Sequence, residues 1–193
     1  MARAETAPPD DEAPRPARRA DRHRVALLAL FGSSWQGVAD SVPMFTAGAR
    51  GRLPVGRGFD LAADAVALYQ RRTSIYGTSQ AVGAELSLVS EARLGFEGGS
   101  VRAGLGLHAV GLRVAGSQGT GAVAFRSAWG SSFGPMMRLA VAAEGRHVVG
   151  ELALEGGWCG PDVVGTAAGG SPIGVGGWWA GLSVAAGWLS GVD

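Results

Sequence analysis

Few residues of this chain have the types and spacing that chemistry at a site would need. The 193 residues include three histidines and one cysteine. Neither His108 nor His147 has a serine and an acid at a spacing that implies a triad. We expect His108 to fill the interior of the fold, His147 to lie at a solvated turn, and Cys159, which has no partner for a disulfide or metal cluster, to be inert. The sequence thus predicts no catalytic residue, no metal site and no cofactor.

The charged residues are more informative, because they alternate with apolar residues. A period of two places charge on one face of a strand and apolar side chains on the other. The formal net charge is only +1, which gives no argument for nucleic-acid binding. We expect Arg52 to pair with Asp60, and Arg138 to pair with Glu151 or Glu155. The charged face predicts a structural network in the interior of the fold, comprising Arg50, Arg52, Asp60, Asp64, Glu85, Glu91, Arg93, Arg102, Arg138, Glu151 and Glu155.

The clearest structural pattern is a hairpin within residues 80–114. Even positions from Val82 to Phe96 are almost all apolar, and residues 97–100 read Glu-Gly-Gly-Ser. Two central glycines tolerate φ > 0 and favour a tight turn, so Phe96 is predicted to face Val101. Past residue 109 the apolar positions change phase, which predicts a bulge or the end of the wall.

Alternating segments elsewhere predict six further strands. A second hairpin is predicted with Leu53 opposite Phe59 and Arg52 opposite Asp60, which would match opposite charges. Long loops are expected at 73–79, at 115–134 (which contains Trp129) and at 159–172. The six strands are expected at residues 24–34, 42–53, 59–72, 136–144, 147–158 and 173–190.

Two features convert the eight strands into an architecture. Short and long connections alternate along the chain, and the apolar face is the one that carries aromatic residues near strand ends. A membrane barrel shows this arrangement, with apolar residues outward and short turns on one side only. The sequence therefore predicts an all-β, eight-stranded, antiparallel up-and-down transmembrane β-barrel over residues 24–193. Its expected lipid-interface aromatics are Phe45, Phe59, Tyr69, Phe96, Trp158, Trp178 and Trp188.

On this pattern the chain resembles the small eight-stranded outer-membrane β-barrel proteins of the OmpA-transmembrane-domain and OmpX type. It is also similar to the glycine- and alanine-rich barrels of GC-rich Gram-negative genomes. The resemblance covers about residues 24–190 and implies location in the outer membrane. Such barrels usually end on an aromatic residue, whereas this sequence ends Ser190-Gly191-Val192-Asp193.

The N-terminal segment differs from the rest in composition. Residues 1–23 are rich in proline and charge without apolar periodicity, which predicts a disordered tail or linker. An alternative is an export signal, with Arg18 and Arg19 preceding a short apolar core at 25–31 and a cleavage site at 37–39. We prefer a first strand at 24–34, with the export signal not evident in this chain.

Two other folds remain open from the sequence. Residues 163–192 carry no charge, and Gly177 and Gly181 form a G-x-x-x-G spacing, as in a transmembrane helix. The same stretch alternates from Trp178 to Trp188, which favours a strand. The charged face could instead point outward in a soluble or periplasmic lipocalin-like β-barrel that binds a small apolar ligand.

The function expected from the preferred fold is modest. An eight-stranded barrel has room only for side chains in its lumen. We expect a monomeric structural component, anchor or loop platform that contacts membrane lipid, with any protein or surface ligand bound at the long loops. An outer-membrane hydrolase acting on lipid is the enzymatic alternative.

Overall fold

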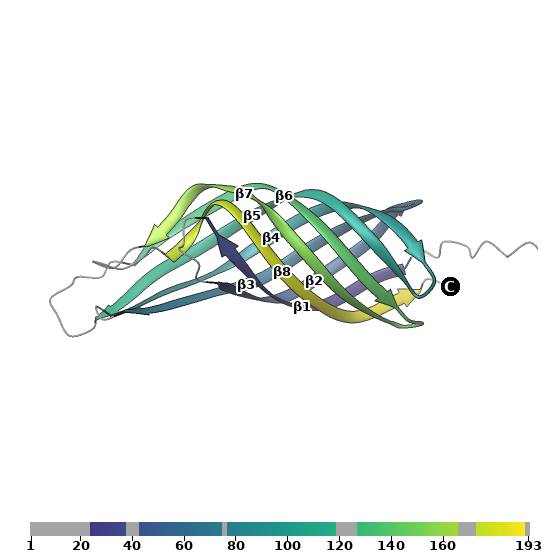
Figure 1. The fold of residues 1–193 in the computed structure, drawn as a ribbon, viewed down its shortest axis with the longest axis horizontal. Helices are drawn as coiled ribbons and strands as arrows, with labels where there is room; N and C mark the ends of the chain where they lie inside the picture. Colours follow the sequence, from purple (N-terminus) through teal and green to yellow (C-terminus); the bar gives the residue numbers. More distant parts are fainter. Residues whose placement is uncertain (1–23, 38–42, 75–76, 119–126, 166–172, 192–193) are drawn as a thin grey trace, which may run out of the picture.

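The computed structural model describes residues 24–37, 43–74, 77–118, 127–165 and 173–191, so the predicted tail at 1–23 lies outside the described residues. Each strand pairs antiparallel with its neighbour in sequence, and β1 also pairs with β8, which closes the sheet into a barrel (Figure 1). The predicted fold class is confirmed. The strands are β1 (Arg24–Gln36), β2 (Met44–Gly56), β3 (Phe59–Ser74), β4 (Gly77–Phe96), β5 (Gly99–Gln118), β6 (Ala128–Glu144), β7 (Val148–Gly165) and β8 (Ile173–Gly191).

The two ends of the barrel differ. Short turns join β2 to β3, β4 to β5 and β6 to β7 at one end, where β8 also finishes (Figure 1, right). We call this the short-turn end and the opposite one the long-loop end. Because the strands tilt, each strand crosses the wall obliquely, and residues far apart in sequence meet inside.

The β4–β5 hairpin has a different register from the predicted one. Phe96 pairs with Gly99 and Leu94 with Val101, so the predicted pairing of Phe96 with Val101 is wrong by two residues. Of the two central glycines only Gly98 has a positive φ, at 81°; Gly58, its counterpart in the β2–β3 turn, has a φ of 74°. Gly99 instead continues the strand, where an added Cβ would lie 2.3 Å from the carbonyl oxygen of Ala142. The second glycine thus permits close strand pairing and lies outside the turn.

The β2–β3 hairpin shows the same two-residue error. Leu53 pairs with Leu61, and Arg50 rather than Arg52 lies opposite a carboxylate, that of Asp64. The register shifts between Pro54 and Gly56, so β2 continues nearly to the turn. A shift of two preserves the face of every side chain, which is why inward and outward positions were still assigned consistently.

Strand β5 contains no bulge at the predicted phase change. Its register with β4 runs unbroken from Gly99 to Gln118, and the even positions from Arg102 to Val114 face inward. Val110, Leu112 and Val114 are therefore interior residues, each at most 6% exposed. What changes along β5 is the composition of the interior, from charged to apolar.

Three segments expected as loops are partly strand. β6 begins at Ala128 and includes Trp129, β7 extends to Gly165, and the 73–79 segment contributes to β3 and β4. The register of β7 shifts between Cys159 and Val163. Because these strands are longer than predicted, the barrel wall extends further toward the long-loop end than the sequence indicated.

The apolar segments near the two ends of the described chain both form strands. Residues 25–31, the apolar core of the export-signal hypothesis, lie within β1. Residues 173–191, part of the candidate transmembrane helix, form β8. Among the residues that the structure describes, no helix is long and apolar enough to cross a membrane.

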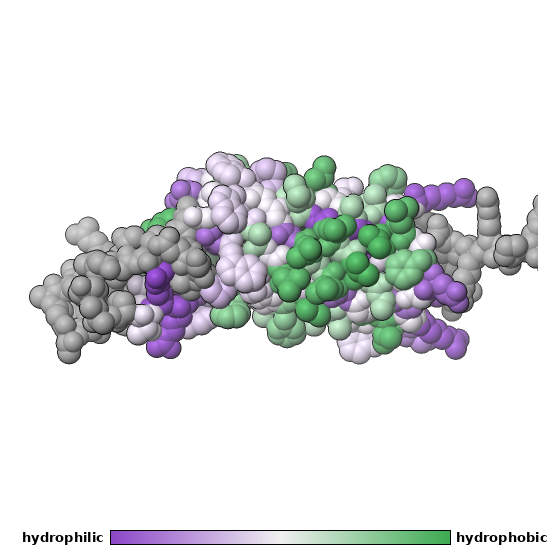
Figure 2. All heavy atoms as spheres, viewed as in Figure 1, coloured by the Kyte–Doolittle hydropathy of each residue, from purple (hydrophilic) through white to green (hydrophobic). Residues whose placement is uncertain are grey.

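The two faces of the wall are opposite in character. Large apolar side chains such as Leu86, Leu105, Leu139 and Leu152 are 51–71% exposed on the outside, whereas arginines and carboxylates fill part of the interior. Figure 2 shows hydrophobic residues gathered over the strands, with strongly hydrophilic groups toward the two ends. The lipocalin-like alternative needs the charged face outside, and the structure places it inside.

Candidate functional site

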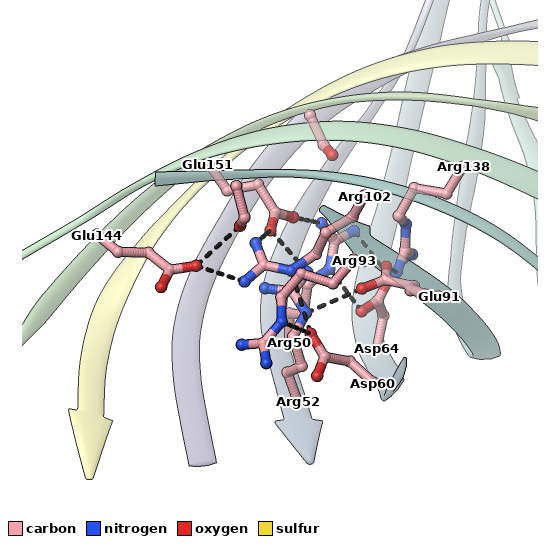
Figure 3. Close-up of polar contacts among 12 residues, drawn as sticks. Arg50, Arg52, Asp60, Asp64, Glu91, Arg93, Arg102, Arg138, Glu144 and Glu151 are labelled. Atoms are coloured by element: carbon pink, nitrogen blue, oxygen red, sulfur yellow. Dashed lines mark hydrogen bonds and ion pairs between the residues drawn. The ribbon is translucent and has the colours of Figure 1, made fainter. Parts of the chain in front are cut away.

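The barrel interior holds a cluster of charged residues in its short-turn half, which we call the ionic layer (Figure 3). The side chains come from β2 to β7 and converge across the lumen, where they form the ion pairs described below. The ionic layer consists of Arg50, Arg52, Asp60, Asp64, Glu91, Arg93, Arg102, Arg138, Glu144, Glu151 and Glu155.

Arg50 lies at the centre of the ionic layer and is fully buried. Its Nε and Nη2 donate to the two carboxylate oxygens of Asp64 at 2.8 and 3.0 Å, the fork-to-fork geometry that arginine favours. The same guanidinium donates to Glu151 and, at 2.5 Å, to Glu155. Since Asp64 is on β3 and both glutamates are on β7, Arg50 ties opposite parts of the wall together.

Arg52 and Arg138 extend the ionic layer on either side. Arg52 donates to Glu91 at 2.9 Å and to Glu151 at 2.6 Å, so the expected pair with Asp60 is wrong. Arg138 donates to Glu155 at 2.8 Å, to Glu91 at 3.2 Å and to Asp64. Of the two partners expected for Arg138, Glu155 is observed.

Asp60 pairs instead with arginines on β4 and β5. Arg102 Nε lies 3.2 Å from Asp60 Oδ2, and Arg93 Nε lies 3.8 Å from the same oxygen. Arg102 also donates to Glu144 at 2.6 Å, a residue absent from the expected network. The alternation places Glu144 on the charged face of β6, and this signal was available in the sequence.

Glu85 lies apart from the ionic layer, next to His108. Its Oε1 is 3.4 Å from His108 Nδ1, and His108 Nε2 accepts a hydrogen bond from Trp179 Nε1 at 3.1 Å. A small cavity lies between this group and the ionic layer, with Asp64, Glu85, Glu155 and Trp179 in its lining. His108 is thus an interior residue held by polar neighbours. No cluster of His, Cys, Asp and Glu among the described residues could hold a metal ion.

The long-loop half of the lumen contains a group of buried apolar side chains, which the sequence analysis missed. We call this group the apolar cap; its members are at most 9% exposed and belong to one contiguous cluster. Gln70, also fully buried, accepts a hydrogen bond from the backbone N–H of Gly174 at 3.1 Å and holds the start of β8 against the cap. The apolar cap consists of Leu68, Val110, Leu112, Val114, Val163, Ile173 and Val175.

The seven aromatic residues expected at the lipid interface all lie on the outer face, 42–72% exposed. Phe45 pairs with Tyr69 and Trp158 with Trp178 toward the long-loop end, whereas Phe59, Phe96 and Trp188 lie toward the short-turn end. Trp35, Trp129 and Phe133 are equally exposed but were not in the expected set.

The distance between the two aromatic groups can be obtained from the strands. Ten residues separate Phe59 from Tyr69 on β3 and Trp178 from Trp188 on β8. At a rise of about 3.4 Å and a tilt of about 45°, ten residues span roughly 24 Å along the barrel axis. Membrane barrels have an apolar band of about 25 Å between aromatic girdles.

Comparison with solved structures identifies the fold. Neisserial surface protein A is similar at 12% identity and a TM-score of 0.55, over 86% of this chain and 95% of that one. Ail, the attachment invasion locus protein of Yersinia pestis, is similar at 10% identity and a TM-score of 0.52, over 88% and 99%. The chain has the fold of the eight-stranded outer-membrane β-barrels, so the expected resemblance is confirmed. No family model and no curated protein matches the sequence.

Proposed function

We propose that this protein is an integral outer-membrane protein of a Gram-negative bacterium, which crosses the bilayer with its eight strands. The observation that carries the proposal is the exposed apolar belt bounded by aromatic residues ten positions apart on β3 and β8. Exposing so many leucines and valines to water would be costly. A closed barrel, in contrast, satisfies its backbone hydrogen bonds within lipid.

Within the membrane we propose a monomeric anchor and platform with a closed lumen. The ionic layer lies in the short-turn half of the interior together with buried apolar side chains of β1 and β7, and the apolar cap lies toward the long-loop end. An ion that entered from the long-loop end would have to cross buried apolar side chains without compensation for its lost hydration. This arrangement supports a structural role and disfavours a pore.

The long-loop rim is the part that we propose to present to other molecules. Ail, the similar barrel, has been solved in complex with the heparin analogue sucrose octasulfate. That complex shows that a barrel of this fold can hold a polyanionic ligand. It supports the proposal that the rim here can bind a surface ligand.

We propose that the chain acts without catalysis. His108 is 4% exposed, and its Nε2 already accepts a hydrogen bond from Trp179. It lies below the apolar cap, where a lipid or peptide substrate has no direct approach. These surroundings support a structural role for the histidine.

Membrane insertion is tested by refolding the protein with and without detergent or phosphatidylcholine vesicles, followed by an unheated gel. Heat-modifiable mobility only in detergent or lipid is the expected result. A folded monomer in plain buffer would refute the proposal. Conductance across a planar bilayer tests the closed lumen separately: we expect no steady channel from the folded protein, and a stable conductance would overturn that part.

A further inference from the structure

Basic side chains gather on the outer face near the long-loop end, apart from the ionic layer. Arg71 on β3 and Arg113 on β5 are both exposed. The guanidinium carbon of Arg113 lies 5.8 Å from the centre of the Trp129 ring, within the range of a cation–π interaction. Trp129 on β6 is itself 74% exposed, so this pair lies open on the outer surface.

The strand register places these residues at the aromatic girdle or just beyond it. Arg71 follows the girdle residue Tyr69 by one outward position on β3. Tyr69 pairs with Val82 on β4, Val82 pairs with Arg113, and Arg113 pairs with Trp129. Since the girdle marks the edge of the hydrocarbon layer, the two arginines lie at the level of the lipid headgroups.

The two arginines are close enough to act on one anion. They lie on strands separated only by β4 and are offset by two residues along the strands, which puts their backbones about 12 Å apart. Between them lies Gln80, an exposed residue of β4 that pairs with Arg71 and with Ala115, two residues from Arg113. An amide there can donate a further hydrogen bond.

No acidic residue lies in the parts of β3 to β6 that surround the two arginines; the nearest exposed acid along the sheet is Asp162 on β7. Segments 69–74, 77–84, 109–118 and 128–133 contain three arginines and neither aspartate nor glutamate. All five arginines of the ionic layer, in contrast, form ion pairs with carboxylates. Exposed arginines without acids at headgroup level are complementary to an anionic headgroup, and arginine binds phosphate in a bidentate manner.

We propose that Arg71, Arg113 and Trp129 form a binding site for the phosphomonoester headgroup of a membrane lipid in the leaflet at the long-loop end. The site holds the phosphate between the two guanidinium groups, and the exposed Trp129 ring packs against the upper part of the lipid. This inference rests on the proposed membrane location. It names the class of ligand that the outer surface near the long-loop end binds.

The test is native mass spectrometry of the refolded full chain in detergent, incubated with equal amounts of phosphatidic acid and phosphatidylcholine of matched acyl chains. We expect preferential retention of phosphatidic acid. A basic residue near an anionic membrane surface contributes about 1 kcal/mol to lipid binding. Removing two of them in R71Q/R113Q should therefore lower the preference for phosphatidic acid about 25-fold. The matched control is R57Q/R146Q, which removes two exposed arginines at the short-turn end; it should keep the preference.

Three results would overturn the inference: no preference in the parent protein, equal preference in both double variants, or displacement of the lipid by equimolar inorganic phosphate. The last would identify a site for a free anion rather than for a lipid. The unheated gel separates this inference from the proposed function. Heat-modifiable protein without lipid preference refutes the lipid site alone, and protein without heat-modifiable mobility in lipid refutes the membrane location.

Discussion

Replacing Arg50 by methionine should destabilise the barrel far more than replacing an exposed arginine. The side chain donates four hydrogen bonds to the carboxylates of Asp64, Glu151 and Glu155 and is fully buried. Methionine retains much of the apolar stem, so the effect measured is mainly electrostatic. Each carboxylate keeps another arginine, because Arg138 contacts two of them and Arg52 contacts Glu151.

The arginines that remain beside these carboxylates determine how much the free energy of unfolding falls. Breaking one buried ion pair costs about 3–5 kcal/mol because a charge is left uncompensated. Here the loss is shared by three carboxylates that remain partly paired, so we expect about 3–5 kcal/mol in total rather than that figure three times. An Asp64→Asn change added to Arg50→Met should recover part of the loss, since it removes one of the three charges left behind.

The assay is equilibrium unfolding in guanidinium chloride of protein refolded into phosphatidylcholine vesicles, followed by tryptophan fluorescence and checked by the unheated gel. The matched control is Arg57→Met, an exposed arginine at the β2–β3 turn, which should lie within about 0.5 kcal/mol of the parent. If Arg50→Met also lies within that range, the ionic layer does not stabilise the barrel and the reasoning fails.

Three further changes probe other parts of the structure. Arg138→Ala removes contacts to Glu155, Glu91 and Asp64 and should also cost about 3 kcal/mol; an unchanged unfolding midpoint would contradict its structural role. Leu152→Arg, on the outer face, should cost about 2–4 kcal/mol in vesicles if it lies near the bilayer midplane, and a cost near zero in the same titration would argue against lipid contact. Gly98→Ala places a Cβ at φ +81° and should cost about 1 kcal/mol. Gly95→Ala, at a position with open space, serves as its control in the same unfolding experiment.

The sequence alone determined which side chains face inward and which face outward. The period of two along residues such as Leu86, Leu88 and Leu94 fixes the face of each neighbour, and an error of two residues in register leaves the faces unchanged. For the same reason the charged interior, the exposed aromatic residues and the number of strands could be predicted although the predicted strand registers were wrong.

Pairing itself depended on local geometry that composition does not encode. Two adjacent glycines offered two possible turns at 97–100, and the choice depended on the close approach of Gly99 to β6. The predicted match of Arg52 with Asp60 was chemically reasonable, but the actual partners come from β4 and β7. Ion pairs across a lumen are set by the closure and tilt of the sheet, which bring residues together that lie about 100 positions apart.

The apolar cap shows this limit most clearly. In the sequence, Val110, Leu112 and Val114 were interpreted as a change of phase. Alternation of polar and apolar residues identifies the inward face of a strand only where the interior is polar. Tertiary structure showed that β5 continues unbroken and that the lumen changes from charged to apolar along its length. The sequence determined the alternation of each strand. Only closure of the barrel decided which inward residues meet, and therefore that the ion pairs gather toward the short-turn end and the apolar cap toward the long-loop end.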